Sequence, residues 1–195
     1  MNKIIKVIFT IFTILFYTPL LANDNFPYYG TKEPQPKVKI EVYSSLTCPH
    51  CANFHLKVLP KLVEKFSQTN KVLIELRDYP LDLAALKAAQ IARCVTTDMQ
   101  KKYLDDIYKN QSQWTKAKTL DDLYKNIENI SSQYGLKGDD FQNCLKNKKE
   151  ENSVLQSRID AQKTYSIDST PTLIINKKKY NGSWNDLEKY INNLL

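Results

Sequence analysis

Strand-like segments occur only near the two ends of this chain, and residues 81–165 between them show helical patterns alone. Apolar and polar side chains alternate, or β-branched residues cluster, in four short runs: Val38–Tyr43, Val72–Arg77, Thr172–Ile175 and Lys178–Tyr180. The order along the chain is thus a strand, a helix and a second strand, then an all-helical stretch, and then a strand hairpin and a final helix.

Helical periodicity and capping signals divide the rest of the chain. A helix should follow Cys51 through Phe66, with a kink or boundary at Pro60. The other expected helices are Leu81–Val95, Asp98–Lys109, one opened by Thr119, Asp139–Lys146, Asn152–Thr164, and Trp184–Leu194 capped by Ser183. Asn176–Lys177 should form a turn, and residues 23–37, rich in Pro, an extended lead-in.

The first 22 residues have the order of a secretory signal peptide. Lys3 and Lys6 precede the apolar stretch Val7–Leu21, and Ala22 offers a small residue before a polar segment. We therefore predict cleavage after residue 22 and a periplasmic location. The alternative is an uncleaved signal anchor, although about 15 apolar residues fall short of the roughly 20 that span a bilayer.

The formal net charge of +7 is compatible with a nucleic-acid-binding protein, but the composition argues against one. Loss of Lys3 and Lys6 with the signal peptide lowers the charge from +7 to +5. Arg occurs only at Arg77, Arg93 and Arg158, and Arg is the residue suited to bidentate readout of guanine and phosphate. We predict a solvated, Lys-rich surface and no nucleic-acid partner.

Four cysteines remain after export to an oxidising compartment, where disulfides persist. Cys48 and Cys51 form a Cys-x-x-Cys motif. Cys94 and Cys144 lie 50 residues apart within the helical stretch, and as a hypothesis they form a structural disulfide. Two separate buried thiols are the alternative for that second pair.

The Cys-x-x-Cys motif has the chemistry of a redox pair. If a helix begins near Cys48, the orphan N–H groups and the helix dipole favour a thiolate there. Pro49 suits the first helical position, and His50 can add a positive charge or a hydrogen bond beside the sulfur. A stabilised thiolate makes the disulfide a strong oxidant. Cys48 should be the nucleophile, and Cys51 the buried partner that resolves the mixed disulfide.

Two further residues near the motif have two interpretations each. Cys48, Cys51 and His55 at i, i+3 and i+7 could hold zinc or copper, but no fourth ligand is evident, so we predict no metal and no cofactor. His55 is otherwise a packed or hydrogen-bonded helix residue. Glu41, on the strand that enters the motif, is either an exposed strand charge or a buried carboxyl that relays the proton of Cys51.

These motifs together resemble the DsbA-like branch of the thioredoxin superfamily. The resemblance covers roughly residues 36–195 and depends on three segments, Cys48–Cys51, Arg77–Asp82 ahead of an Ala-rich helix, and Ser169–Asn176. It implies a thioredoxin-like α/β core made of residues 23–80 and 166–195, with residues 81–165 as an inserted all-helical domain. It also implies that Pro171 is cis and lies beside the cysteines. The peptide at Thr170 would then face an extended substrate segment. From the residues alone, an ordinary trans proline at the start of an edge strand is the favoured interpretation of Pro171.

The resemblance also implies a function. A chain of this type introduces disulfides into unfolded or reduced secreted proteins and is reoxidised by a membrane quinone-linked partner of DsbB type. Thr170 departs from the Val of the best-studied oxidases of this branch, which leaves the direction of the reaction open. The alternatives are a disulfide isomerase or reductase, and a non-enzymatic dithiol protein that binds metal or client chains.

Overall fold

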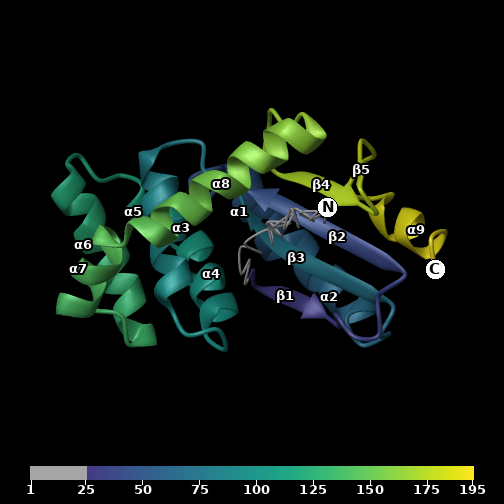
Figure 1. Ribbon diagram of the computed structural model, residues 1–195, viewed down its shortest axis with the longest axis horizontal. Helices are drawn as coiled ribbons and strands as arrows, with labels where there is room; N and C mark the ends of the chain where they lie inside the picture. The colour runs from purple at the N-terminus through teal and green to yellow at the C-terminus, as the bar shows by residue number, and fades with distance from the viewer. Residues whose placement is uncertain (1–25) are drawn as a thin grey trace, which may run out of the picture.

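The computed structural model describes residues 26–195, which form one mixed sheet with helices on both faces and a group of helices at one end (Figure 1). The strands are β1 (Tyr28–Gly30), β2 (Val38–Ser44), β3 (Val72–Asp78), β4 (Thr172–Ile175) and β5 (Lys178–Lys179). The helices are α1 (Pro49–Asn53), the π-helical segment η1 (Phe54–Val58), α2 (Leu59–Phe66), α3 (Leu83–Cys94), α4 (Gln100–Lys109), α5 (Gln111–Trp114), α6 (Leu120–Ser131), the 3₁₀ turn η2 (Ser132–Tyr134), α7 (Gly138–Lys146), α8 (Lys148–Tyr165) and α9 (Leu187–Asn192).

The sheet joins strands from both ends of the chain, in the order β1-β3-β2-β4-β5. The central strands β2 and β3 run parallel, with Ser44 opposite Asp78, and the other pairs are antiparallel. The predicted α/β sheet is therefore confirmed. Strand β1 is an addition, because residues 23–37 were expected to be an extended lead-in; Tyr28–Gly30 instead pairs with the outer edge of β3.

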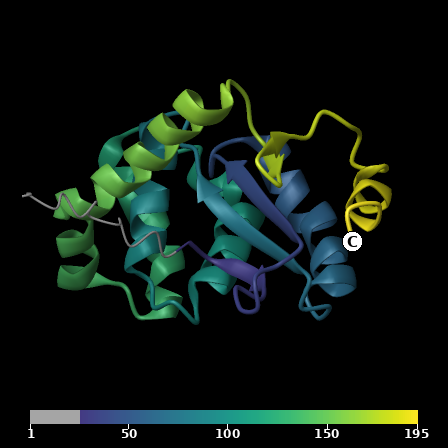
Figure 2. The ribbon, with the colours of Figure 1, turned by 45° about the vertical axis from the view of Figure 1, so that its right-hand side comes forward.

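Strand β2 is buried on both faces. Val38, Ile40 and Val42 pack against the helices α2 and α9. Tyr43, which points to the opposite face, packs with Ala161 of α8. Figure 2 shows α2 and α9 on one side of the sheet, while α8 runs from the helical group back to the sheet on the other side.

The segment after Cys51 is broken as Pro60 predicted. Helix α1 passes into the π-helical segment η1, and α2 starts anew with Pro60 in its first turn. Pro lacks an N–H, so it fits the first turn of a helix and disrupts the interior. The π-helical segment itself, which carries His55, has no signal in the sequence.

Helices α3 to α8 lie between β3 and β4 in the chain and pack around their own apolar cluster. Side chains cap three of them: Asp82 accepts from Ala85 N at 2.7 Å, Thr119 from Asp122 N at 3.1 Å, and Asn147 from Lys149 N at 3.0 Å. The Thr119 cap was predicted. Helix α8 begins at Lys148, four residues before the expected Asn152, because Asn147 caps it.

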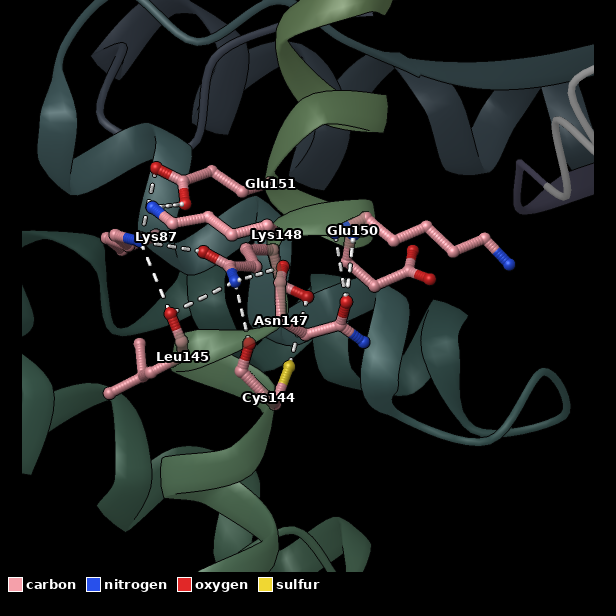
Figure 3. A network of polar contacts seen from close by, with 9 residues as sticks. Lys87, Cys144, Leu145, Asn147, Lys148, Glu150 and Glu151 are labelled. Atoms are coloured by element: carbon pink, nitrogen blue, oxygen red, sulfur yellow. Dashed lines mark hydrogen bonds and ion pairs between the residues drawn. The ribbon is translucent and has the colours of Figure 1, made fainter.

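Helix α3 holds the end of α7 through a disulfide and through a buried polar network, and Figure 3 shows the polar network. The disulfide joins Cys94 to Cys144. The fully buried Gln90 donates from Nε2 to the carbonyls of Cys144 at 2.6 Å, Leu145 at 3.2 Å and Asn147 at 3.0 Å. Lys87 donates to Gln90 Oε1 at 2.9 Å. Two of the three carbonyls also accept a backbone N–H, Cys144 O from Asn147 N at 3.0 Å and Asn147 O from Glu151 N at 3.1 Å, so α3 adds further donors at the end of α7.

The C-terminal segment forms the predicted hairpin and a shorter helix than expected. Asn176 and Lys177 both have positive φ, 46° and 65°, as a two-residue hairpin turn requires. Helix α9 starts at Leu187 rather than Trp184. Ser183 Oγ accepts from Asp186 N at 3.3 Å, so it closes the turn that precedes the helix.

The predicted signal peptide, residues 1–22, lies outside the described residues. Within residues 26–195, every helix is too short or too polar to cross a bilayer.

Candidate active site

Cys48 occupies the N-cap position of α1, as the motif predicted. Its backbone is extended, with φ −79° and ψ 120°, and Pro49 opens the helix. The Cys48 N–H donates to Ser45 O at 3.2 Å, and the Cys48 carbonyl accepts the first helical hydrogen bond from Ala52 N at 3.1 Å. The thiol therefore lies where the first N–H groups of the helix are unpaired.

Cys51 lies one turn further along α1 and is fully buried. Both residues are free thiols, so the structure describes the dithiol form. The Ser45 N–H donates to Cys51 Sγ at 3.4 Å. The same turn that leads into Cys48 thus also contacts its partner.

Thr170 and Pro171 face the cysteines from the other end of the chain. The Thr170–Pro171 peptide is cis. Cys48 Sγ donates to the Thr170 carbonyl at 3.4 Å. In the dithiol form, Thr170 Oγ1 is buried and has no hydrogen-bond partner among the described residues, so its hydrogen can turn toward the Cys48 sulfur when that sulfur ionises.

The pKa of the Cys48 thiol is lower than its ordinary value. Burial raises the pKa, but hydrogen bonds from the Thr170 hydroxyl and from the backbone N–H groups of Cys51 and His50 lower it by more. The site therefore favours the thiolate at the position expected to attack.

Cys51 has the opposite character. Burial, together with the nearby Cys48 charge, raises its pKa to about 12, although the Thr170 hydroxyl and the Ser45 N–H lower it in part. A buried thiol with this pKa stays protonated while Cys48 ionises. The two sulfurs thus have separate roles: an exchanging thiolate and a protonated partner.

The two histidines differ from each other. The side chain of His50 is exposed, and it is the backbone N–H of His50 that faces the sulfur. His55 is buried: its Nε2 lies 2.7 Å from Asp105 Oδ1, and its ring packs against Tyr108 with 4.6 Å between centroids. His55 is thus a packed, hydrogen-bonded helix residue. Within residues 26–195, no three His, Cys, Asp or Glu side chains gather in a group that could hold a metal.

Glu41 is buried, but the structure does not bring it to the cysteines. Its carboxylate lies 3.0 Å from Arg77 Nη2 and 3.5 Å from Lys39 Nζ, and it accepts from the Tyr165 hydroxyl of α8 at 3.4 Å. The neighbouring Val42 points to the face covered by Phe54. Because side chains alternate along a strand, Glu41 points away from the face that carries the cysteine helix. Its burial contradicts the exposed strand charge, and its hydrogen-bond and ion-pair partners are Arg77, Lys39 and Tyr165 rather than a cysteine.

Three residues with no predicted role in the site hold the loop before Cys48. Gln111 of α5 donates to the carbonyls of Leu46 at 2.8 Å and Cys48 at 3.0 Å. Tyr108 of α4 donates to Ser45 O at 3.5 Å, and Asp82 accepts from the Thr47 hydroxyl at 2.7 Å. Only Asp82 had a local signal, as a residue type that caps helices.

The arrangement of a helix-capping Cys-x-x-Cys beside a cis-proline on a mixed sheet can be compared with known proteins. The family model described as thioredoxin matches residues 24–193. The chain belongs to the thioredoxin family. Its fold is that of the DsbA-like proteins, as the resemblance implied.

A solved structure of alpha-DsbA1 from Wolbachia pipientis is 28% identical, covers 90% of this chain and 92% of its own, and has a TM-score of 0.73. A structure titled protein-disulfide isomerase, from Novosphingobium aromaticivorans, is 20% identical with a TM-score of 0.76, covers 87% of this chain and 98% of its own, and shows the fold alone.

The curated relatives are longer than this chain. A Rickettsia bellii protein named as a protein-disulfide oxidoreductase is 27% identical over 156 residues, which are 79% of this chain and 58% of the relative. A Rickettsia conorii protein with a similar name is 26% identical, over 80% of this chain and 54% of its own length. The chain thus spans a little more than half the length of these two relatives.

Proposed function

We propose that this thioredoxin-family chain is a periplasmic thiol–disulfide oxidoreductase of DsbA type that introduces disulfides into reduced, unfolded secreted proteins. The observation that supports the proposal is that the pKa values of the two thiols are shifted in opposite directions. Cys48, opposite Thr170 at the start of α1, has a lowered pKa, while the pKa of the buried Cys51 is raised to about 12. A stabilised thiolate at the attacked position makes the corresponding disulfide easy to reduce.

The exchange proceeds in two steps from the oxidised protein. A substrate thiolate attacks Cys48 Sγ, the Cys48–Cys51 bond breaks, and Cys51 leaves as a thiolate that takes up a proton, as its raised pKa requires. A second substrate thiolate then attacks the substrate sulfur of the mixed disulfide, and Cys48 leaves as a thiolate. The substrate loses two electrons to become a disulfide, and the Cys48–Cys51 pair gains them as a dithiol.

The substrate segment would dock beside Thr170 and Pro171. The Thr170 carbonyl already accepts from Cys48 Sγ, so a chain that pairs with this backbone would present its sulfur at the correct atom. A membrane quinone-linked partner of DsbB type would return the dithiol to the disulfide.

A stoichiometric oxidation assay tests the proposal. The purified, oxidised protein is mixed with a reduced model substrate, and free thiols are counted after acid quenching. We expect one disulfide to form for each chain reduced, and none with Cys48→Ser. Activity only on a scrambled substrate, with no net oxidation of a reduced one, would assign the chain as an isomerase. Tightly retained zinc or copper without exchange would assign it as a metal-binding protein.

A further inference from the structure

Gln111 reaches from the helical insertion to the backbone on both sides of Thr47. Its side chain is buried in the short helix α5, and Nε2 lies 2.8 Å from Leu46 O and 3.0 Å from Cys48 O. An amide nitrogen carries two hydrogens. Gln111 therefore gives one hydrogen to each carbonyl.

The orientation of this amide follows from its surroundings. With the amide reversed, its oxygen would face two carbonyl oxygens, and neither could donate a hydrogen to it. Only the orientation with Nε2 toward the loop satisfies the carbonyls. A residue without a donor at position 111 would leave the Leu46 carbonyl buried with one partner fewer.

The Cys48 carbonyl belongs to the peptide plane that joins Cys48 to Pro49. This plane sets the direction in which the first turn of α1 leaves Cys48, and hence how the N–H groups of His50 and Cys51 face the Cys48 sulfur. The same carbonyl accepts from Ala52 N at 3.1 Å. Gln111 thus adds a second donor, from a different helix, to the carbonyl on which the helix start depends.

The rest of the α4–α5 corner supports the same loop. Tyr108 donates to Ser45 O at 3.5 Å and stacks on His55, and His55 in turn contacts Asp105 at 2.7 Å. Cys48 and Cys51 themselves belong to the apolar cluster that the helical insertion builds. The environment of the redox pair is therefore made as much by the insertion as by the sheet.

We propose that Gln111 is a positioning residue of the redox pair, which fixes the Leu46–Cys48 backbone so that the first turn of α1 and Thr170 face the Cys48 sulfur together. The inference rests on the proposed exchange through Cys48. Gln111 acts through the backbone and does not touch the reacting sulfurs. Its loss changes the acidity of Cys48 and the stability of the disulfide relative to the dithiol.

The test compares two glutamines of the same helix. Gln111→Met keeps the length of the side chain and removes both donors, while Gln113→Met changes an exposed neighbour as a matched control. The ultraviolet absorbance of the thiolate is followed from pH 2 to 9, where it reports Cys48, because the pKa of Cys51 is about 12. Equilibrium with glutathione measures the redox balance, and thermal unfolding measures stability.

We expect Gln111→Met to raise the pKa of Cys48 by about one unit, equivalent to about 1.4 kcal/mol, and to shift the glutathione equilibrium toward the disulfide by about tenfold. Gln113→Met should leave both at the wild-type value. A lower melting temperature with unchanged acidity and equilibrium would overturn the proposal, because it is the result of a merely structural role.

Gln111→Asn serves if Gln111→Met does not fold. Its amide keeps the donors but is one methylene too short to reach both carbonyls, so an intermediate rise in the pKa of Cys48 supports the proposal and no rise overturns it. Failure of the wild-type protein in the oxidation assay would refute the proposed function, whereas the thiolate titration still decides the role of Gln111.

Discussion

Cys48 Sγ and the carbonyl oxygen of Thr170 lie 3.4 Å apart, although 122 residues separate them in the chain. The contact joins the start of α1 to the loop before β4. These two segments lie side by side because α1 follows β2, and β2 pairs with β4. The Thr170 hydroxyl, buried next to the same sulfur, lowers the pKa of both Cys48 and Cys51. The residue before the cis-proline therefore takes part in setting the acidity of the redox pair.

Replacing the Thr170 hydroxyl should make Cys48 less acidic. Thr170→Val keeps the branched shape and removes the donor, and a hydrogen bond to a charged group contributes roughly 1.5–3 kcal/mol. We expect the pKa of Cys48 to rise by about one unit in a thiolate absorbance titration. The exposed Thr164→Val is the control and should titrate as wild type. An unchanged pKa in Thr170→Val would mean that the helix start alone stabilises the thiolate.

The stability of the dithiol form should depend on pH with a defined sign. The pKa of Cys48 is lower in the folded protein than in an unfolded chain. The ionised Cys48 therefore stabilises the fold at a pH above the pKa of the unfolded chain, and this stabilisation is lost as the pH falls through the pKa of the folded protein. The pKa of Cys51 is raised to about 12 in the folded protein. The protonated Cys51 therefore stabilises the fold at a pH below the pKa of the unfolded chain, and this stabilisation is lost as the pH rises toward 12.

Denaturant unfolding of the reduced protein measures this dependence. We expect the difference in unfolding free energy between wild type and Cys48→Ala to grow from acidic pH to about pH 8.5, where a free Cys ionises, by at most about 1.4 kcal/mol per pH unit. A difference that is flat or falls over this interval would show that Cys48 is not more acidic in the folded state.

The Cys94–Cys144 disulfide should stabilise the fold without tuning the redox pair. It closes a loop with a sequence separation of 50, for which the chain-entropy model gives roughly 4 kcal/mol. We expect Cys94→Ala/Cys144→Ala to lose up to about this much unfolding free energy in urea, with the Cys48 titration unchanged. A variant as stable as wild type would indicate that the pair does not stabilise the protein.

The polar network beneath this disulfide makes a separate contribution. Gln90 is fully buried and its Nε2 donates to the carbonyls at the end of α7, so Gln90→Leu removes both hydrogens of this amide from the buried network. We expect a loss of roughly 3 kcal/mol in unfolding free energy and faster amide exchange in α7. Gln142→Leu, on the exposed side of α7, is the matched control. Equal stability of the two variants would contradict the role of Gln90.

How much of this site the sequence revealed depended on the range of each interaction. The start of α1 at Cys48, the Thr119 cap and the Asn176–Lys177 turn are local, because the residues that specify them lie within a few positions of one another. Strand β1 has only three residues and is defined by its pairing with β3, so the sequence carries no periodic pattern that predicts it. Gln111 is a polar residue on a short helix, and its burial follows only from where the Leu46–Cys48 loop lies.

Glu41 illustrates the same limit, because the side of the sheet to which a strand residue points is fixed by register and by what covers each face. Its carboxylate contacts Arg77 at 3.0 Å and Lys39 at 3.5 Å, on the face covered by α8. Glu41→Gln should therefore leave the pH profile of thiol–disulfide exchange unchanged, because the carboxyl does not reach Cys51.

The same substitution should lower the unfolding free energy, because the partly buried Arg77 loses one of its carboxylate partners. Another partner, Glu75, still contacts Arg77 at 2.6 Å. Stopped-flow exchange with a reduced peptide between pH 4 and 9, together with urea unfolding, separates the two effects. Glu64→Gln, at an exposed position of α2, is the control for a change of charge alone. A displaced exchange profile in Glu41→Gln, absent from the control, would restore a proton-relay role to this carboxyl.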